Sequence, residues 1–422
     1  MLNIKLLRES PEFVKERLTI RNFDATKILE SILDLDIKRR GLQTEVDSLL
    51  AEQNIISREI GSLMREGKKN EAEEAKSSVT QLKNSSKELE SKMTLYSKEL
   101  DDLLVLLPNL PHSSVPMGKT AQENEIVKEG GVIPKLKYST PHWELAQRYE
   151  IIDFDLGVKL TGAGFPVYKG KGARLQRALI AYFLDKNSSA GYNEVMPPLM
   201  VNEASGYGTG QLPDKGEQMY HIGLDNFYLI PTAEVPVTNI YRDVILSQKE
   251  LPVKVTAYTP CFRREAGSYG KDVRGLNRLH QFDKVEIVQV SHPDFSYTAL
   301  EEMVSHVEAL VNELGLPYRI LRLCGGDMGF TSALTYDFEV FSAAQKRWLE
   351  VSSVSNFETF QANRLKLRYR DNEGKTQLAH TLNGSSLALP RILAALLENY
   401  QEDGKIKIPD VLVPYTGFSY ID

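Results

Sequence analysis

Positive charge is concentrated in one stretch of the chain, from Phe262 to Glu286. This stretch reads FRREAGSYGKDVRGLNRLHQFDKVE and is typical of a β-hairpin: a strand that ends near Glu265, a polar glycine-rich loop, and a second strand that begins near Gln281. The hairpin carries the cations Arg263, Arg264, Lys271, Arg274 and Arg278. By itself, such a hairpin is either a solvated surface or a surface that faces nucleic acid.

A second candidate residue is Arg391, in the string NGSSLALPRILAALLENYQ. Asn383 and Gly384 are typical turn residues, and Pro390 suits the start of the apolar helix that follows. A guanidinium group fixed at a helix start can grip a phosphate with two hydrogen bonds or stack on an aromatic ring. Arg391 is therefore a candidate anion-binding residue, and the alternative is an ordinary surface arginine.

The elements that position these residues form a mixed pattern. Strands are predicted at 227–230, 253–258, 284–290 and 318–323, and helices at 173–190 and 298–314. Several of the connecting loops are too short for crossover helices, which favours an α+β domain with an antiparallel sheet. No G-x-x-x-x-G-K-[ST] phosphate loop follows any strand, so ATP, if it is used, is held in another way.

Before this body, apolar residues repeat with heptad spacing in two segments. The first seam contains Ile32, Leu35, Arg39, Leu42, Val46, Leu49, Gln53, Ile56, Ile60 and Leu63, and the second contains Ala72, Ala75, Val79, Leu82, Ser86, Leu89, Met93, Tyr96, Leu100, Leu103 and Leu107. A short polar turn with Gly67 joins them, which predicts an antiparallel helical hairpin on the order of 48 Å long. We expect the second helix to stop at Pro108. The pattern alone equally fits a dimerisation coil or a spacer.

Composition limits the remaining possibilities. With 51 basic and 57 acidic residues the net charge is −6, so charge balance gives no sign of a nucleic-acid partner. No apolar run is long enough to cross a bilayer, and the acidic N-terminus is unlike a targeting signal, so we expect a cytoplasmic protein without a membrane partner. Two cysteines and seven histidines argue against a structural zinc site and for two reduced thiols.

The hairpin, Arg391 and the strings between them together resemble class II aminoacyl-tRNA synthetases, and in particular bacterial-type seryl-tRNA synthetases. The resemblance covers essentially the whole chain: GYNEVMPPLMV is similar to the first signature motif, with Pro198 at the dimer interface, the cationic hairpin is similar to the second, and the string ending at Arg391 is similar to the third. It implies a class II antiparallel sheet flanked by helices in residues 111–422, and an N-terminal tRNA-binding domain with a coiled-coil arm in residues 1–110.

The resemblance implies a ligase that activates L-serine with ATP to seryl-adenylate and transfers it to the 3′ end of tRNA(Ser), and to tRNA(Sec) where this is present. Arg263 would bridge the α-phosphate and the serine carboxylate, and Arg391 would pack near adenine and also reach the terminal phosphates. ATP-binding residues implied by the motifs are Arg263, Arg264, Glu265, Phe282, Glu350, Val351, Ser352, Ser353 and Arg391. Glu350 would also contact Mg²⁺ through ATP.

The same resemblance assigns the recognition of L-serine. The implied residues are Thr232, Ala233, Glu234, Arg263, Glu286, Asn383 and Ser385, with Glu234 suited to the substrate ammonium and Glu286 to its hydroxyl. The arm would cross to the other subunit of a homodimer and grip the long variable arm of the tRNA, while Lys271 and Arg274 would contact its acceptor end. The alternatives are a ligase that loads a carrier protein, and a non-catalytic coiled-coil scaffold.

Overall fold

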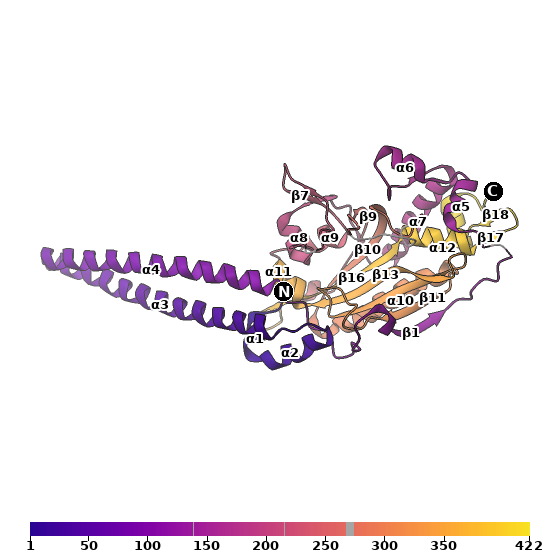
Figure 1. Cartoon of the computed structure of the whole chain (residues 1–422). Coiled ribbons are helices and arrows are strands. Elements are labelled where there is room, and N and C mark those ends of the chain that lie inside the picture. The colour runs from indigo at the N-terminus through magenta and orange to yellow at the C-terminus, as the bar shows by residue number, and fades with distance from the viewer. Residues whose placement is uncertain (138, 215, 267–273) are drawn as a thin grey trace. The chain divides into compact units, whose positions relative to one another are not determined.

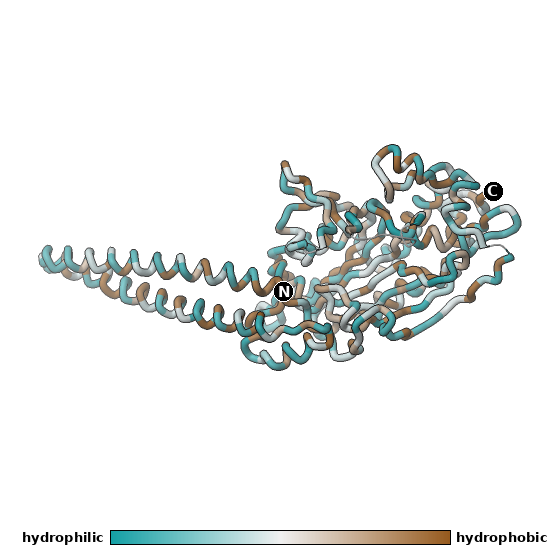
Figure 2. Tube along the Cα trace, in the orientation of Figure 1, coloured by the Kyte–Doolittle hydropathy of each residue, from teal (hydrophilic) through white to brown (hydrophobic). Residues whose placement is uncertain are grey.

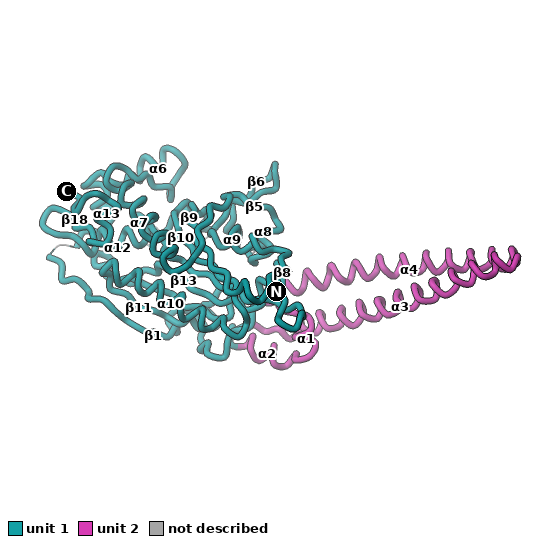
Figure 3. The backbone as a smooth tube through the Cα atoms, turned by 180° about the vertical axis from the view of Figure 1, so that it is seen from behind, with its two compact units in different colours: residues 1, 20–22, 109–422 teal, residues 2–19, 23–108 magenta. Residues whose placement is uncertain are grey.

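The chain folds into two compact units, described here from a computed structural model of residues 1–137, 139–214, 216–266 and 274–422. Unit 2 contains Leu2–Thr19 and Phe23–Pro108, and unit 1 contains Met1, Ile20–Asn22 and Asn109–Asp422 (Figure 3). Each unit has its own hydrophobic core, and each is described separately below.

Unit 2 is built from four helices: α1 (Ile4–Glu9), α2 (Pro11–Ile20), α3 (Thr26–Arg65) and α4 (Lys69–Leu104). The helices α3 and α4 lie side by side and form the predicted antiparallel hairpin, which reverses at Gly67 with a φ of 75° (Figure 1). Every residue of the two predicted seams is buried or partly buried, whereas most other positions are exposed. In Figure 2, teal hydrophilic stretches alternate with brown hydrophobic ones along both helices, as expected for a single apolar seam.

The end of α4 differs from the prediction, because the helix stops at Leu104 and not at Pro108. The amide groups of Leu106 and Leu107 bond only three residues back, to Leu103 and Leu104, so the chain tightens before the proline. Proline disfavours helical geometry in the residue before it, and the last turn is lost with that residue.

A buried carboxylate, which periodicity did not reveal, lies in α3. Asp36 is 1% exposed, and it receives Arg40 Nε at 2.9 Å, Arg39 Nη2 at 3.1 Å and Arg8 Nη1 at 3.4 Å. Arg39 is one of the two polar breaks in the first seam, and its partner explains why the break is tolerated. Through the Arg8–Asp36 ion pair, this cluster links α1 to α3.

Replacement of Asp36 by Ala should therefore destabilise unit 2 by about 1–3 kcal/mol, because it leaves several guanidinium groups without their acceptor. Hydrogen exchange of the α3 amides in the full chain, followed by mass spectrometry, measures this. Asp34→Ala is the matched control, because Asp34 pairs with Lys38 on the exposed face of the same helix. Equal protection loss in the two variants would contradict the role given to Asp36.

Unit 1 contains an eight-stranded sheet with the strand order β1-β11-β12-β13-β16-β10-β9-β4. Its strands are β1 (Glu125–Gly130), β4 (Asn193–Glu194), β9 (Val253–Phe262), β10 (Gln281–Ser291), β11 (Tyr318–Arg322), β12 (Leu334–Ser342), β13 (Arg347–Glu358) and β16 (His380–Ala388). All neighbours pair antiparallel except β4 and β9, which are parallel. The expected α+β class with an antiparallel sheet is confirmed.

Three long helices pack against this sheet: α7 (Gly170–Ser189) on β9 and β10, α10 (Ser296–Glu313) on β13 and β16, and α12 (Leu389–Asn399) on β10, β12 and β13. The core between them is aliphatic and aromatic, and Phe338 and Leu393 in it are fully buried. The helix α12 is buried along nearly its whole length, which fixes the residues at its start. None of the helices in the described ranges is long and apolar enough to cross a membrane.

The shorter elements of unit 1 surround this layer. The helices are α5 (His142–Arg148), α6 (Phe154–Leu160), α8 (Glu203–Thr209), α9 (Glu234–Asn239), α11 (Thr359–Leu365) and α13 (Val413–Thr416). The strands are β2 (Ile152–Asp153), β3 (Val167–Tyr168), β5 (Met200–Asn202), β6 (His221–Ile222), β7 (Phe227–Leu229), β8 (Ile245–Ser247), β14 (Arg368–Arg370), β15 (Thr376–Leu378), β17 (Gln401–Glu402), β18 (Lys405–Lys407) and β19 (Tyr420–Ile421).

Asn383 and Gly384 do not form the predicted turn, because both lie inside β16. This strand is flanked by β10 and β13, so its backbone groups are used by the sheet on both sides. A Cβ atom on Gly384 would come 3.0 Å from Val354 Cγ2, so the glycine serves close packing between neighbouring strands. The Asn-Gly signal was misleading here because tertiary pairing outweighed turn propensity.

Candidate active site

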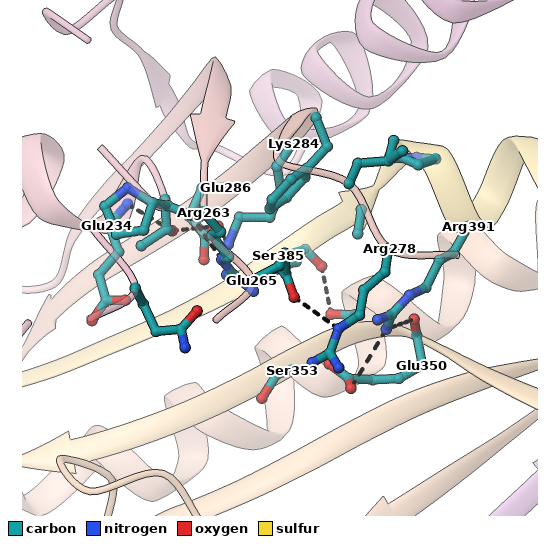
Figure 4. Close-up of a pocket in the computed structure, with 18 of the residues that line it drawn as sticks. Glu234, Arg263, Glu265, Arg278, Lys284, Glu286, Glu350, Ser353, Ser385 and Arg391 are labelled. Atoms are coloured by element: carbon teal, nitrogen blue, oxygen red, sulfur yellow. Dashed lines mark hydrogen bonds and ion pairs between the residues drawn. The ribbon is translucent and has the colours of Figure 1, made fainter. Parts of the chain in front are cut away.

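A cavity of about 590 Å³ opens above the central strands of unit 1. Polar side chains from β10, β13, β16 and the start of α12 point into it (Figure 4). Of the predicted site residues, those that line it are Thr232, Glu234, Arg263, Glu265, Phe282, Glu286, Glu350, Val351, Ser352, Ser353, Asn383, Ser385 and Arg391. Residues that lie more than 100 positions apart in the sequence therefore meet in one place.

Two predicted residues are not brought into the cavity. Ala233 is fully buried, and Arg264 is exposed with its backbone amide donating to Gln218 O at 2.8 Å. Lys271 lies outside the described residues. Arg274 is described, and its guanidinium carbon lies 4.8 Å from the centre of the Trp143 ring.

One face of β10 supplies three side chains to the cavity. Phe282, Lys284 and Glu286 are two residues apart, so the alternation of the strand points them all the same way. Lys284 and Glu286 form an ion pair and are 6% and 1% exposed. Lys284 was missed in the sequence, although its spacing from Phe282 and Glu286 would have revealed it.

Arg263 follows the end of β9 and is held from two sides. Its Nε atom donates to Pro231 O at 3.3 Å, and its guanidinium carbon lies 5.1 Å from the centre of the Phe282 ring. A guanidinium on an aromatic face is attracted by the ring electrons and keeps its remaining hydrogen-bond donors free. Arg263 can therefore present donors to an anion in the cavity.

Two further arginines reach the cavity from other elements. Arg278 Nε pairs with Glu265 Oε2 at 2.8 Å. Arg391, in the first turn of α12, donates from Nη1 to Glu350 O at 2.7 Å and from Nε to Asn277 O at 3.1 Å, and its Nη1 lies 3.6 Å from Glu350 Oε2. Figure 4 shows Arg278 and Arg391 on the same side of the cavity. With Arg263 they give this site three guanidinium groups, which suits a polyanion.

The other side of the cavity is acidic. Glu234 is buried, and its Oε1 accepts from Gln361 Nε2 at 2.6 Å. Thr232 Oγ1 donates to Glu286 Oε2 at 3.3 Å and accepts from the amide of Glu234 at 3.2 Å. Burial, together with the nearby Glu286 charge, raises the pKa of Glu234 to about 7. Glu286 is paired with the Lys284 ammonium, and the two buried carboxylates together are suited to receive a further cationic group.

Glu350 and Ser353 on β13 are the candidate ligands for a cation. The Glu350 side chain is 50% exposed, so its oxygen atoms can be reached from the cavity. Burial and the neighbouring Glu350 raise the pKa of Asp337, on the adjacent strand β12, well above its usual value. Within the described ranges, His, Cys, Asp and Glu side chains nowhere gather in groups of three or more that could hold a metal.

Comparisons with known proteins agree over the whole length of the chain. Residues 1–111 match the family model "Seryl-tRNA synthetase N-terminal domain", and residues 220–400 match "tRNA synthetase class II core domain (G, H, P, S and T)". A serine–tRNA ligase of Salinibacter ruber is 51% identical over 100% of this chain and 99% of its own length, and one of Chlorobaculum parvum is 47% identical over 100% of both.

Solved structures give the same result. The crystal structure of seryl-tRNA synthetase from Pyrococcus horikoshii complexed with ATP superposes with a TM-score of 0.88 at 35% identity, covering 100% of this chain and 99% of that one. Cytoplasmic serine–tRNA ligase from Naegleria fowleri in complex with AMP superposes with a TM-score of 0.88 at 27% identity.

Proposed function

The chain belongs to the seryl-tRNA synthetase family and is an ATP-dependent serine–tRNA ligase, and from this premise we propose how its residues divide the reaction. In the first step the serine carboxylate attacks the α-phosphorus of ATP and pyrophosphate leaves, and in the second the seryl group passes to the 3′ end of tRNA(Ser). The observation that carries the proposal is the separation of charge in one cavity: Arg278 and Arg391 lie on one side, the buried Glu234 and Glu286 lie on the other, and Arg263 lies between them (Figure 4).

The arginines would bind and neutralise the phosphates. We assign Arg263 to the α-phosphate and the serine carboxylate, because it lies between the arginine side and the acidic side of the cavity (Figure 4). Arg278 and Arg391 would hold the outer phosphates. Their positions are fixed before substrate arrives, and fixed charges of this kind stabilise the charge that develops in the transition state. No protein nucleophile is required.

Adenine would stack on Phe282, with Glu265 accepting from its amino group. Because Arg263 lies 5.1 Å from the Phe282 ring, a base on this ring would bring its own phosphates close to that arginine. Glu350 and Ser353 would hold Mg²⁺ together with phosphate oxygens of ATP, where the ion supplies charge neutralisation. Val351 and Ser352 complete the β13 wall, and Ser352 Oγ donates to Ser385 O at 2.6 Å.

The acidic side would bind L-serine. Glu234 receives the ammonium group, with Thr232 beside it, and Glu286 and Ser385, which are paired across β10 and β16, face the hydroxyl. Asn383 closes the same wall. A carboxylate placed to accept from the serine hydroxyl favours serine over alanine and glycine, because those two amino acids offer no donor at that position.

For the RNA step, we propose that residues 1–110 form the tRNA-binding domain and residues 111–422 the catalytic domain. The α3–α4 hairpin would grip tRNA(Ser), and tRNA(Sec) where it is present, across a homodimer. RNA helices are recognised mainly through shape and phosphate contacts, which a long hairpin with mixed charge can supply. Lys271 and Arg274 would contact the acceptor end. A cytoplasmic location follows from the role in translation.

The first test compares two adjacent arginines. Arg263→Ala should lower serine-dependent ATP–pyrophosphate exchange by about 10²–10³-fold, the usual loss when one donor to a developing charge is removed. Arg264→Ala is the matched control, because Arg264 does not line the cavity, and it should retain nearly normal exchange. An equal loss of exchange activity in the two variants would contradict the role proposed for Arg263.

The second test uses pH. The carboxyl of Glu234 has a raised pKa of about 7, so it is ionised above that pH and neutral below it. Because only the ionised form attracts an ammonium group, the KM for serine should rise by up to about tenfold for each pH unit below 7. The KM for ATP serves as the internal control and should not follow this curve, and Glu234→Gln should abolish the pH dependence. A constant serine KM between about pH 6 and pH 8 would argue against this role.

The third test separates the two steps. Deletion of residues 35–103 should leave ATP–pyrophosphate exchange intact and lower the charging of tRNA(Ser) by about 100-fold, equivalent to about 2.7 kcal/mol of lost binding. Normal charging by the deletion variant would show that the α3–α4 hairpin is not needed to bind tRNA(Ser). If the intact chain performs exchange but does not charge tRNA(Ser), the proposed transfer step is wrong.

A further inference from the structure

A buried histidine and glutamate lie behind the cavity without lining it. His142, the first residue of α5, and Glu398, near the end of α12, are both 0% exposed, and His142 Nδ1 lies 2.7 Å from Glu398 Oε1. On its other side, His142 Nε2 accepts a hydrogen bond from the backbone amide of Leu276 at 2.8 Å. Leu276 belongs to residues 274–279, which return from the cationic loop to β10 and are called the return limb below.

The partners of His142 fix its tautomer. A backbone N–H can only donate, so Nε2 carries no proton, and a carboxylate can only accept, so Nδ1 carries one. The ring therefore acts as a neutral bridge with a fixed direction, from the Leu276 amide to the Glu398 carboxylate. This arrangement places the ring, and with it Leu276, at a defined distance from α12.

A second bridge runs from the same carboxylate to the next residue. Gln345, in the β12–β13 turn, donates from Nε2 to Glu398 Oε1 at 3.1 Å, and Asn277 Nδ2 donates to Gln345 Oε1 at 3.0 Å. Glu398 also accepts from the backbone amide of His142 and from the Ser342 hydroxyl. One buried carboxylate thus holds two consecutive residues of the return limb.

The return limb is shaped to approach His142 closely. Gly275 has a φ of 66°, and a Cβ atom at this position would lie 2.3 Å from His142 Nε2. Both observations require glycine, since other residues rarely adopt this φ and no side chain fits against the ring. The backbone of the return limb is therefore built against the imidazole.

Leu276 and Asn277, which the two bridges hold, lie next to the two arginines proposed to bind the outer phosphates of ATP. Asn277 O accepts from Arg391 Nε at 3.1 Å, and Arg278, the next residue, pairs with Glu265. A shift of Leu276 and Asn277 would therefore move both guanidinium groups. Thr232, Glu234 and Glu286 have separate contacts, through Gln361 and through each other.

We propose that His142 and Glu398 are positioning residues for ATP binding: they hold Leu276 and Asn277 so that Arg278 and Arg391 face the phosphates. The inference rests on the roles proposed above for these two arginines. The proposal also explains why a carboxylate, and not an apolar side chain, is buried at position 398. Glu398 accepts four hydrogen bonds, whereas an apolar side chain could fill the same space but could hold none of these donors.

Two substitutions of His142 each remove one of its two side-chain hydrogen bonds and keep the other. In His142→Asn the amide nitrogen replaces Nδ1 and can still donate to Glu398, but the Leu276 amide loses its acceptor. In His142→Gln the amide oxygen replaces Nε2 and can accept from Leu276, while the donor to Glu398 is lost. We expect His142→Asn to raise the KM for ATP in pyrophosphate exchange by about 10–100-fold, the loss that follows when a group orienting a metal ligand is removed, with little change in the KM for serine.

His142→Gln should restore most of the ATP affinity, since it keeps the contact with the return limb. Gln345→Ala tests the second bridge at a partly exposed turn where folding is not at risk, and it should raise the KM for ATP alone. His306→Asn is the matched control: His306 also forms one side-chain hydrogen bond inside unit 1, at 2.7 Å to Asn187, and has no contact with the return limb.

The outcomes separate the two hypotheses. If the intact protein shows no serine-dependent exchange, the proposed function fails. If it shows exchange, but His142→Asn and Gln345→Ala leave the KM for ATP unchanged, or raise the KM for ATP and for serine equally, or match His306→Asn, the positioning role is wrong.

Discussion

Charge that is withdrawn from water needs a partner, and this constraint shapes the centre of unit 1. Lys284 and Glu286 share one face of β10, Arg278 pairs with Glu265, and Arg391 pairs with Glu350. The Lys284–Glu286 pair is buried, where an isolated ion would be costly, whereas the two arginine pairs are partly exposed and mainly orient their side chains. The cavity is thus a set of charges that are oriented by contacts within the protein.

The sheet makes this arrangement possible. Antiparallel pairing sets β10 beside β16 and β16 beside β13, so that Glu286 faces Ser385 across one pair and Gly384 faces Val354 across the other. Alternation along β10 then selects which of its side chains point into the cavity. The buried helix α12 carries Arg391 near one end and Glu398 near the other, and so connects the arginine side of the cavity to the buried carboxylate behind it.

Unit 2 follows a different physical rule. Its long helices are stabilised by one continuous apolar seam, so most of their surface is free to be polar. The buried Asp36 cluster departs from this rule, and its arginines show that a polar break in a seam is tolerated when its partners are supplied locally. The cavity with its oriented charges is lined by residues of unit 1.

The sequence by itself determined the elements whose signal is local and repeated: the two heptad seams, the alternating strands, the helix with Pro390 in its first turn, and the motif strings that carry Arg263, Glu286 and Arg391. Only the tertiary structure decided what depends on neighbours far along the chain. It placed Asn383 and Gly384 inside β16, buried Asp36 among arginines, left Arg264 outside the cavity, and joined His142 to Glu398 across 256 positions. Propensity and spacing report on a few residues at a time, whereas the energy of a buried polar group is set by partners that the fold alone brings within hydrogen-bond distance.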